Sequence, residues 1–390
     1  MKITAPFLND AGLHQVMAML ERAGHRALIV GGAVRNALLD RAIDDIDITT
    51  DARPEQVVEL ARKAGLKAIP TGIEHGTITV VAADQPFEIT TFRRDIETDG
   101  RRATIAYSDR IEEDAGRRDF TMNALYADAS GQIIDPVRGL PDLAARRLRF
   151  VGDPATRIRE DYLRILRFFR FLACYADSPA PGGIEAIRDG VPGLGRVSAE
   201  RIGAEMRKLL AAADPAPAMT LMAQTGVLAQ ILPGADPAPL PALIRAEQDH
   251  DIAPDWPRRL ASLGTQDAPI RLRLSKAEAA YLARLGAASG LPPAEATFHF
   301  GPDIARDATL IRIARGTAPD PAQDPGWPEQ IARAAASPLP IRAGDLIPDL
   351  SGPALGRGLR AAEALWIASG FTASRDALVD AARQAGKEGA

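Results

Sequence analysis

The chain of 390 residues is 46% hydrophobic and 25% charged, which is typical of a globular protein with more than one domain. Its formal net charge of −4 excludes a chain that is basic throughout, so any nucleic-acid surface has to be local. A single cysteine excludes an internal disulfide and fits a reducing compartment, so we expect a cytoplasmic protein. No run of eighteen apolar residues is present, so we predict no membrane-spanning helix.

An apolar run, Leu28–Val30, precedes Gly31 and Gly32, and a helix is predicted over Ala33–Leu39. A glycine turn between a strand and a helix lets backbone N–H groups approach phosphate oxygens, and the helix N-terminus favours an anion. Arg35, in the first turn of this helix, could reach the same anion. The alternative is an ordinary turn without a ligand.

A second predicted strand carries two acids, Asp45 and Asp47. Because side chains alternate along a strand, Ile46 and Ile48 would face the core, and the acids would share the other face with Thr49. Neighbouring carboxylates repel unless a cation lies between them, and hard oxygen ligands favour Mg²⁺. Two such ions about 3.5–4 Å apart would suit in-line displacement at phosphorus. The alternative is a solvated pair of acids at a strand edge.

Polar groups continue through the next hundred residues. On the predicted strand Phe87–Phe92, Glu88 is either a third carboxylate for the metal or a solvated side chain. The stretch Arg93–Ala106 is predicted to be a polar loop. Arg117 and Arg118 could grip a triphosphate or a ribose, and Asp119 could cap a short helix. These arginines are interleaved with acids, so a salt-bridged surface is the alternative.

From Pro136 onward the hydrophobic pattern is helical. One long helix is predicted from Pro154 through Cys174, and another over Val197–Leu210. After Ala211 short helical runs alternate with proline-rich turns, and no catalytic constellation is evident there. The sequence therefore predicts a sheet domain followed by helical regions, an α+β fold.

In combination these motifs resemble the bacterial class II nucleotidyltransferases, which include CCA-adding tRNA nucleotidyltransferases and poly(A) polymerases. The resemblance covers roughly residues 26–210. The Gly-Gly … Asp-x-Asp stretch is similar to the family's metal motif. Four more segments are similar to its ribose-recognition motif, hinge, base-selecting Glu-Asp-x-x-Arg and last helical motif: 117–119, 135–153, 160–164 and 197–202. Asn36 departs from the Asp that commonly follows the arginine.

The resemblance implies a nucleotidyltransferase head at residues 1–140, a helical neck at 141–210, and a helical body and tail at 211–390 that would bind tRNA. It implies that Asp45 and Asp47 are catalytic ligands of Mg²⁺. We assign ten residues to the nucleotide, with Glu160 as support for base selection: Gly31, Gly32, Arg35, Arg117, Arg118, Asp119, Asn123, Asp161, Arg164 and Arg167.

Asp161 and Arg164 also have a direct chemical interpretation. Positions three apart share a helix face, and an ionised Asp only accepts hydrogen bonds while Arg only donates them. Cytosine and adenine each present an amino donor beside a ring acceptor, which matches this pair. Guanine and uracil present the reverse pattern. The pair could therefore accept CTP and ATP and reject GTP and UTP, or it could be an ordinary surface salt bridge.

We predict an enzyme that adds C, C and A to the 3′ end of tRNA from CTP and ATP and releases pyrophosphate. The first alternative is a poly(A) polymerase or A-adding enzyme, although the basic stretch common in poly(A) polymerases is replaced here by Thr71–Thr77 and no basic tail follows. The second is a catalytically inactive RNA-binding protein, against which the intact Asp45/Asp47 pair argues. We expect no membrane partner, and the sequence specifies no oligomeric state.

Overall fold

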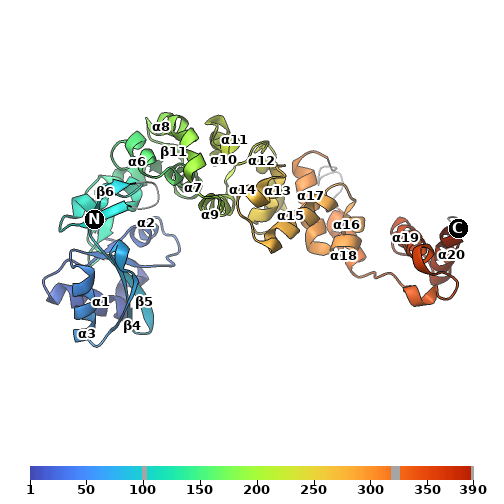
Figure 1. Ribbon diagram of the computed structural model, residues 1–390, viewed down its shortest axis with the longest axis horizontal. Helices are drawn as coiled ribbons and strands as arrows, with labels where there is room; N and C mark the ends of the chain where they lie inside the picture. The colour runs from blue at the N-terminus through green and yellow to red at the C-terminus, as the bar shows by residue number, and fades with distance from the viewer. Residues whose placement is uncertain (99–102, 318–325, 388–390) are drawn as a thin grey trace. The chain divides into compact units, whose positions relative to one another are not determined.

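The computed structural model of the chain describes residues 1–98, 103–317 and 326–387. The chain forms two compact units, Met1–Pro233 and Gly234–Ala390. Every strand of the described residues belongs to the first unit, and the second is built of helices (Figure 1). The predicted α+β class is confirmed. The finer division at residues 140 and 210 stays a prediction.

A seven-stranded sheet forms the centre of the first unit, with the strand order β3-β4-β5-β2-β1-β8-β9. Strands β2 and β5 are parallel, and the other neighbours are antiparallel. The strands are β1 (Leu28–Val30), β2 (Asp47–Thr50), β3 (Lys67–Gly72), β4 (Thr77–Ala82), β5 (Gln85–Thr91), β8 (Tyr126–Ala127) and β9 (Ile133–Ile134).

One row of side chains shows which face of this sheet is the core. Ile29, Ile48, Ile89 and Ile78 are neighbours across four strands, and all are fully buried. Two helices pack on β4 and β5 and also contact each other (Figure 1). They are α1 (Ala11–Arg22) and α3 (Pro54–Lys63). The adjacent row, with Asp47 and Glu88, faces the other side because strand side chains alternate.

Two local predictions are wrong. The predicted loop Arg93–Ala106 is a two-stranded hairpin of β6 (Arg93–Thr98) and β7 (Ala103–Tyr107), and its residues 99–102 lie outside the described part. The prediction gave more weight to the many charged residues of this stretch than to its β-branched residues, which favour extended backbone. The predicted helix Pro154–Cys174 is two helices, because the backbone of Asp161 is extended.

The rest of the first unit is largely helical. The second half of the broken helix packs against the ninth and tenth helices of the chain. The helices are α2 (Gly32–Leu38), α4 (Ile111–Gly116), α5 (Gly139–Ala144), α6 (Pro154–Glu160), α7 (Leu163–Tyr175), α8 (Gly183–Gly190), α9 (Ala199–Leu210), α10 (Ala216–Gln224) and α11 (Val227–Ile231). The short strands β10 (Arg147–Leu148) and β11 (Ser178–Pro179) pair in parallel.

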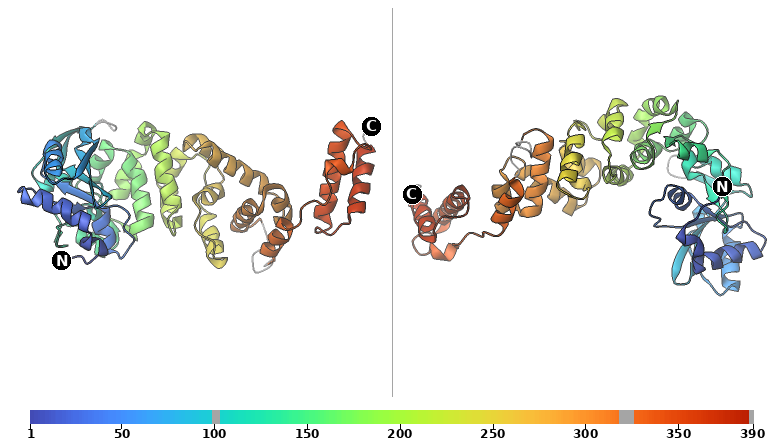
Figure 2. Two further views of the ribbon diagram at one scale, coloured as in Figure 1. Left: turned by 90° about the horizontal axis from the view of Figure 1, so that it is seen from below. Right: turned by 180° about the vertical axis from the view of Figure 1, so that it is seen from behind.

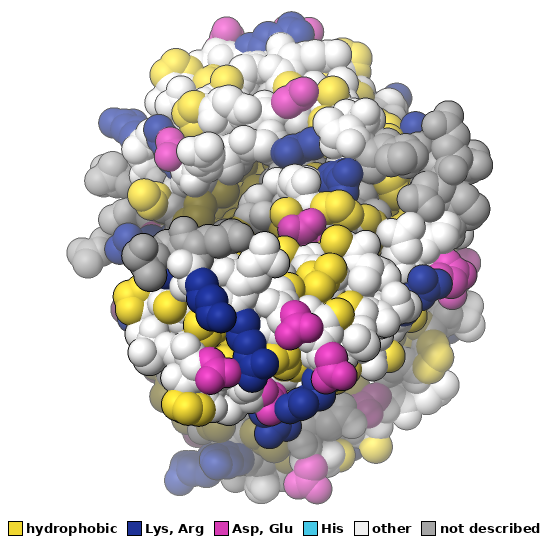
Figure 3. All heavy atoms as spheres, turned by 90° about the vertical axis from the view of Figure 1, so that its right-hand side faces the viewer, with side chains coloured by type: hydrophobic (Ala, Val, Ile, Leu, Met, Phe, Trp, Pro, Cys, Tyr) yellow, Lys and Arg dark blue, Asp and Glu magenta, His cyan; other side chains and the backbone are white. Residues whose placement is uncertain are grey.

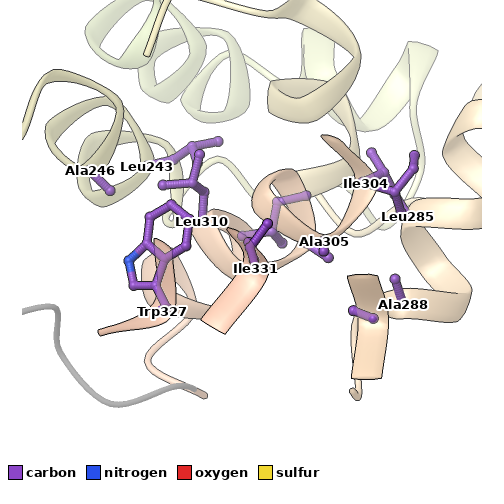
Figure 4. Close-up of a cluster of buried hydrophobic side chains, with 12 residues drawn as sticks. Leu243, Ala246, Leu285, Ala288, Ile304, Ala305, Leu310, Trp327 and Ile331 are labelled. Atoms are coloured by element: carbon purple, nitrogen blue, oxygen red, sulfur yellow. The ribbon is translucent and has the colours of Figure 1, made fainter. Parts of the chain in front are cut away.

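The second unit has two apolar clusters. In the first, Leu243, Leu285, Leu310, Trp327 and Ile331 come together from four helices (Figure 4). The second cluster lies around the last two helices, which pack side by side (Figure 2). The helices are α12 (Leu240–Asp249), α13 (Trp256–Ser262), α14 (Ala268–Arg271), α15 (Lys276–Ala288), α16 (Pro293–Phe300), α17 (Pro302–Ala314), α18 (Trp327–Ala335), α19 (Gly352–Ala368) and α20 (Arg375–Lys387). None of the described helices is long and apolar enough to cross a membrane.

Candidate active site

The glycine turn between β1 and α2 brings two arginines together. Gly31 has a backbone φ angle of +72°, which residues other than glycine rarely adopt. A Cβ atom at Gly31 would lie 3.5 Å from Nη1 of Arg118, and one at Gly32 would lie 3.8 Å from Nη2 of Arg35. The turn therefore offers close backbone approach with a guanidinium on each side, which is the chemistry that a polyphosphate needs.

The predicted acids lie beside this turn. Asp47 is the first residue of β2, and the parallel register places it next to Glu88 of β5, on the same face. Burial, followed by the charges of Glu88 and Asp45, raises the pKa of Asp47, while Arg118 acts in the opposite direction. Asp45 precedes the strand, so the predicted strand alternation applies to Asp47 but not to Asp45.

The three predicted carboxylates form an open group at the surface, although partial burial of the Asp47 carboxylate is enough to raise its pKa. In residues 1–98, 103–317 and 326–387, no group of three or more His, Cys, Asp or Glu side chains has the geometry of a metal site. The side chains of Asp45, Asp47 and Glu88 are all exposed to solvent. Their mutual repulsion is therefore relieved by solvent in this arrangement, and a cation would relieve it further.

Arg117 and Arg118 are held by an acid that sequence reasoning missed. Asp114 of α4 is fully buried, and it accepts from Nε of Arg117 at 3.0 Å and from Nη2 of Arg118 at 3.0 Å. The hydroxyl of Tyr126 donates to the same carboxylate at 2.8 Å. Burial alone would raise the pKa of Asp114, but the two arginines and Tyr126 lower it overall. The spacing of Asp114 to both arginines, three and four residues, was the available signal.

Asp119 connects the turn to the helical part of the unit. It accepts from the backbone N–H of Phe120 at 2.8 Å and from Nδ2 of Asn123 at 2.9 Å, so it does not cap the short 3₁₀ helix Thr121–Asn123 as predicted. Nε of Arg167 donates to its other oxygen at 2.8 Å. Burial would raise the pKa of Asp119, but Arg167 and the hydrogen bonds lower it.

Arg35 completes this chain of contacts. Its Nη1 donates to Oδ1 of Asn123 at 2.6 Å, and its guanidinium lies 3.8 Å from the centre of the Tyr175 ring. Four of the predicted residues, from three segments of the chain, thus form one network of hydrogen bonds: Arg35, Asn123, Asp119 and Arg167. Tyr175, the last residue of α7, was missed because the predicted helix ended one residue earlier, at Cys174.

Asp161 and Arg164 do not form the shared helix face that the sequence predicted. Asp161 lies in the extended break between α6 and α7 and binds Nη2 of Arg201 from α9 at 2.6 Å. Arg164 forms an ion pair with Glu160 and donates to the carbonyl of Arg157 at 2.6 Å. Glu160 therefore contacts Arg164, as its predicted supporting role requires. Arg201, which holds Asp161, was not identified from the sequence.

Glu205 of α9 is a second missed partner. It is buried, and it accepts from Nε of Arg170 at 2.6 Å and lies 3.8 Å from Nη1 of Arg167. Since Arg167 also binds Asp119, this arginine bridges two carboxylates, one from the segment after α4 and one from α9. The four-residue step from Arg201 to Glu205 places both on one face of α9, directed at α7.

Comparisons with known proteins identify the family to which the chain belongs. Residues 27–149 match the family described as the Poly A polymerase head domain, and residues 180–238 match the probable RNA and SrmB-binding site of polymerase A. The CCA-adding enzyme of Geobacillus stearothermophilus is 35% identical over 361 residues, which is 86% of this chain and 84% of that protein. The chain belongs to the CCA-adding enzyme family.

Two further relatives define the extent of the likeness. Human mitochondrial CCA tRNA nucleotidyltransferase 1 is 40% identical over 217 residues, and the match spans 54% of this chain and 50% of the relative. The chain thus spans about half the length of several curated family members that it matches. The crystal structure of the Bacillus stearothermophilus CCA-adding enzyme in complex with CTP has a TM-score of 0.68 and 31% identity, and it covers 94% of this chain and 93% of that one.

Proposed function

We propose that this protein is a template-independent RNA nucleotidyltransferase that adds CCA to the 3′ end of tRNA from CTP and ATP and releases pyrophosphate. The observation that carries the proposal is the position of the carboxylates beside the turn. Asp47 is paired with Val30, the residue before Gly31, and Arg118, whose Nη1 lies 3.5 Å from the position of a Cβ atom at Gly31, partly offsets the rise in the pKa of Asp47. A site for a polyphosphate and a site for a cation are therefore adjacent, in a chain of this family.

The cofactor that this proposal requires is a divalent cation, and we assign Mg²⁺. Asp45 and Asp47 would hold it; in the described residues Glu88 does not complete a three-carboxylate group with them. Hard oxygen donors suit this ion. Burial, followed by the charge of Glu88, raises the pKa of Asp47, and a bound cation would oppose both effects by favouring the ionised carboxylate. When bound, such an ion stabilises charge on the transferring phosphoryl group and lowers the pKa of the attacking hydroxyl.

The chain's own residues would bind and orient the nucleotide. Arg35 and Arg118 would bind the phosphates at the glycine turn, with Arg117 beside them. Asn123 and Asp119 would contact the ribose, and Arg167 would hold Asp119 in place. Because the protein fixes these groups before the nucleotide arrives, less ordering remains to be done when the reaction begins.

Selection of the base is assigned to Asp161 and Arg164, each held by a partner of opposite charge. Arg201 orients the carboxylate, which only accepts, and Glu160 orients the guanidinium, which only donates. Cytosine and adenine offer the complementary donor and acceptor. The two side chains can serve as a template although they come from different backbone conformations.

The tRNA would bind through local basic groups. On the face drawn in Figure 3, Lys and Arg side chains are interspersed with Asp and Glu. In the sequence of the first unit, arginines are dense between Arg93 and Arg170. We therefore expect tRNA binding that depends on phosphate contacts and weakens as salt concentration rises, because binding releases condensed counterions.

The experiment is to incubate the purified protein with Mg²⁺ and tRNA that lacks its terminal CCA, adding each NTP alone and then CTP with ATP. Addition of two C residues from CTP, followed by one A, supports the proposal. Long tails from ATP alone indicate a poly(A) polymerase. A single A on tRNA ending in CC, without C addition, indicates an A-adding enzyme, and no product with any NTP contradicts all three activities.

A further inference from the structure

Asn36 uses both ends of its side-chain amide. Its Oδ1 accepts from Nε and Nη2 of Arg35 at 3.1 and 2.8 Å, and its Nδ2 donates to the carbonyl of Ala42 at 2.7 Å. A guanidinium can only donate and a carbonyl can only accept, so these partners fix the orientation of the amide. No carboxylate could make both contacts, because an ionised carboxylate has no proton to donate.

The Arg35 contact matters because of how this arginine is paired. Arg35 as a whole residue is 6% exposed, and the two side chains that accept hydrogen bonds from it, Asn36 and Asn123, are neutral amides. Burial lowers the pKa of Arg35. The charge of Asp119 acts on Arg35 from nearby, but the hydrogen bonds of the Arg35 side chain go to neutral amides, so less of its positive charge is cancelled than in a direct ion pair with a carboxylate.

The Ala42 contact fixes the loop that connects α2 to the acids. The backbone carbonyl of Asn36 also accepts from the N–H of Arg41 at 2.9 Å, so backbone and side chain of one residue both hold this loop. Asp45 follows Ala42 by three residues and Asp47 by five. Between Ala42 and the start of β2 the chain has no regular secondary structure to fix its path.

We propose that Asn36 is a positioning residue that couples the Arg35 guanidinium to the loop carrying Asp45, and that this role requires an amide. The inference rests on the proposed function and deepens it. It names the residue that holds the phosphate-binding arginine and the carboxylate-bearing loop in fixed positions relative to each other. It also gives a physical role to the position at which this chain departs from the residue common in its family.

Two variants separate the two contacts. Asn36→Asp keeps the acceptor for Arg35, loses the donor to Ala42 and adds a negative charge. Asn36→Ala loses both contacts and leaves Arg35 with its charge. Asp40→Asn is the matched control, because Asp40 is exposed in the same loop and Asn also tolerates its positive φ of +51°.

The first measurement is limited trypsin cleavage after Arg41, followed by mass spectrometry. Loss of the Ala42 hydrogen bond should speed this cleavage about three- to tenfold in both Asn36 variants, with the control unchanged. Cleavage does not depend on activity, so it tests the loop contact even if the proposed reaction is wrong. Parental cleavage rates in both folded variants would overturn the proposal.

The second measurement is steady-state incorporation from CTP. Asn36→Ala should lower kcat more than it raises KM, because the loop with Asp45 loosens while Arg35 keeps its charge. Asn36→Asp should in addition raise KM about tenfold, because its carboxylate competes with the phosphates for Arg35. An unchanged KM in Asn36→Asp would contradict the coupling to Arg35. If Asn36→Ala does not fold, the nearly isosteric Asn36→Asp still decides the question in both measurements.

Discussion

Buried arginines serve different purposes in the two units. In the second unit, Arg258 and Arg259 are each 1% exposed and share the carboxylate of Glu247 at 2.8 and 2.7 Å, and Asp307 lies 2.9 Å from Arg258. In the first unit, Arg35 is almost as buried but is fixed by amides. An arginine whose charge is cancelled by buried carboxylates joins helices, whereas one fixed by neutral groups keeps its charge for a ligand.

The largest effect is expected at the carboxylates beside the glycine turn. Asp47→Ala should abolish nucleotide addition, a loss of about a thousandfold or more, because removing a metal ligand acts on the transition state. Asp45→Ala should behave in the same way. Radiolabelled CTP incorporation at fixed tRNA measures the loss. The control is Asp44→Ala, an exposed acid next to them. Near-normal incorporation by either variant would remove the metal assignment.

Removing a buried charge in the second unit should lower the stability of the protein and not act on the chemical step. Glu247→Gln removes the carboxylate shared by two buried guanidiniums, which should lower the free energy of unfolding by about 3–5 kcal/mol. Urea denaturation followed by circular dichroism measures it. Asp303→Asn is the control, because Asp303 pairs with Arg306 at 3.2 Å with a side chain 80% exposed, and such pairs contribute about 0–1 kcal/mol. A similar small change in both variants would contradict the contrast between the units.

Arg164 tests the base-selecting template. Arg164→Ala should lower the use of CTP and ATP and narrow the preference over UTP and GTP by about ten- to a hundredfold, because one bidentate contact typically contributes 1–3 kcal/mol. Single-nucleotide incorporation with each NTP measures the preference. Arg159→Ala, an exposed arginine on the adjacent helix, is the control. An unchanged preference in Arg164→Ala would show that this pair is structural only.

The smallest effect concerns pH. A raised pKa means that the folded state binds the Asp47 proton more tightly than the unfolded state does, so ionisation lowers stability as pH rises past the ordinary Asp value of about 4. Asp47→Asn cannot ionise. Without metal its Tm should therefore exceed the parent's at pH 7, and the difference should vanish near pH 3. Added Mg²⁺ should raise the Tm of the parent alone. A variant less stable than the parent at pH 7 would contradict this assignment.

The sequence predicted correctly those elements whose conformation depends on neighbouring residues in the chain. The strand Leu28–Val30 was predicted with its observed bounds, because a short apolar run before two glycines allows few alternatives. The residues of the candidate site also came from motifs, and the structure brings most of them together. Contacts between distant segments were not predictable: the pairing of Asp161 with Arg201 depends on how α9 packs on α7. The same packing allows the helix to break at Asp161, against its local pattern.

One face of α7 contacts three separate parts of the candidate site. Arg164, Arg167, Phe171 and Tyr175 recur every three or four residues, so they form a single stripe. Through this stripe the helix contacts the carbonyl of Arg117, the carboxylate of Asp119 and the guanidinium of Arg35. A one-residue insertion in α7 would turn every later position by about 100° and separate Tyr175 from Arg35 while leaving Arg164 in place. The residues that we propose to bind the base, the ribose and the phosphates are therefore coupled through one helix, and a change in the length of α7 between Arg164 and Tyr175 would separate them.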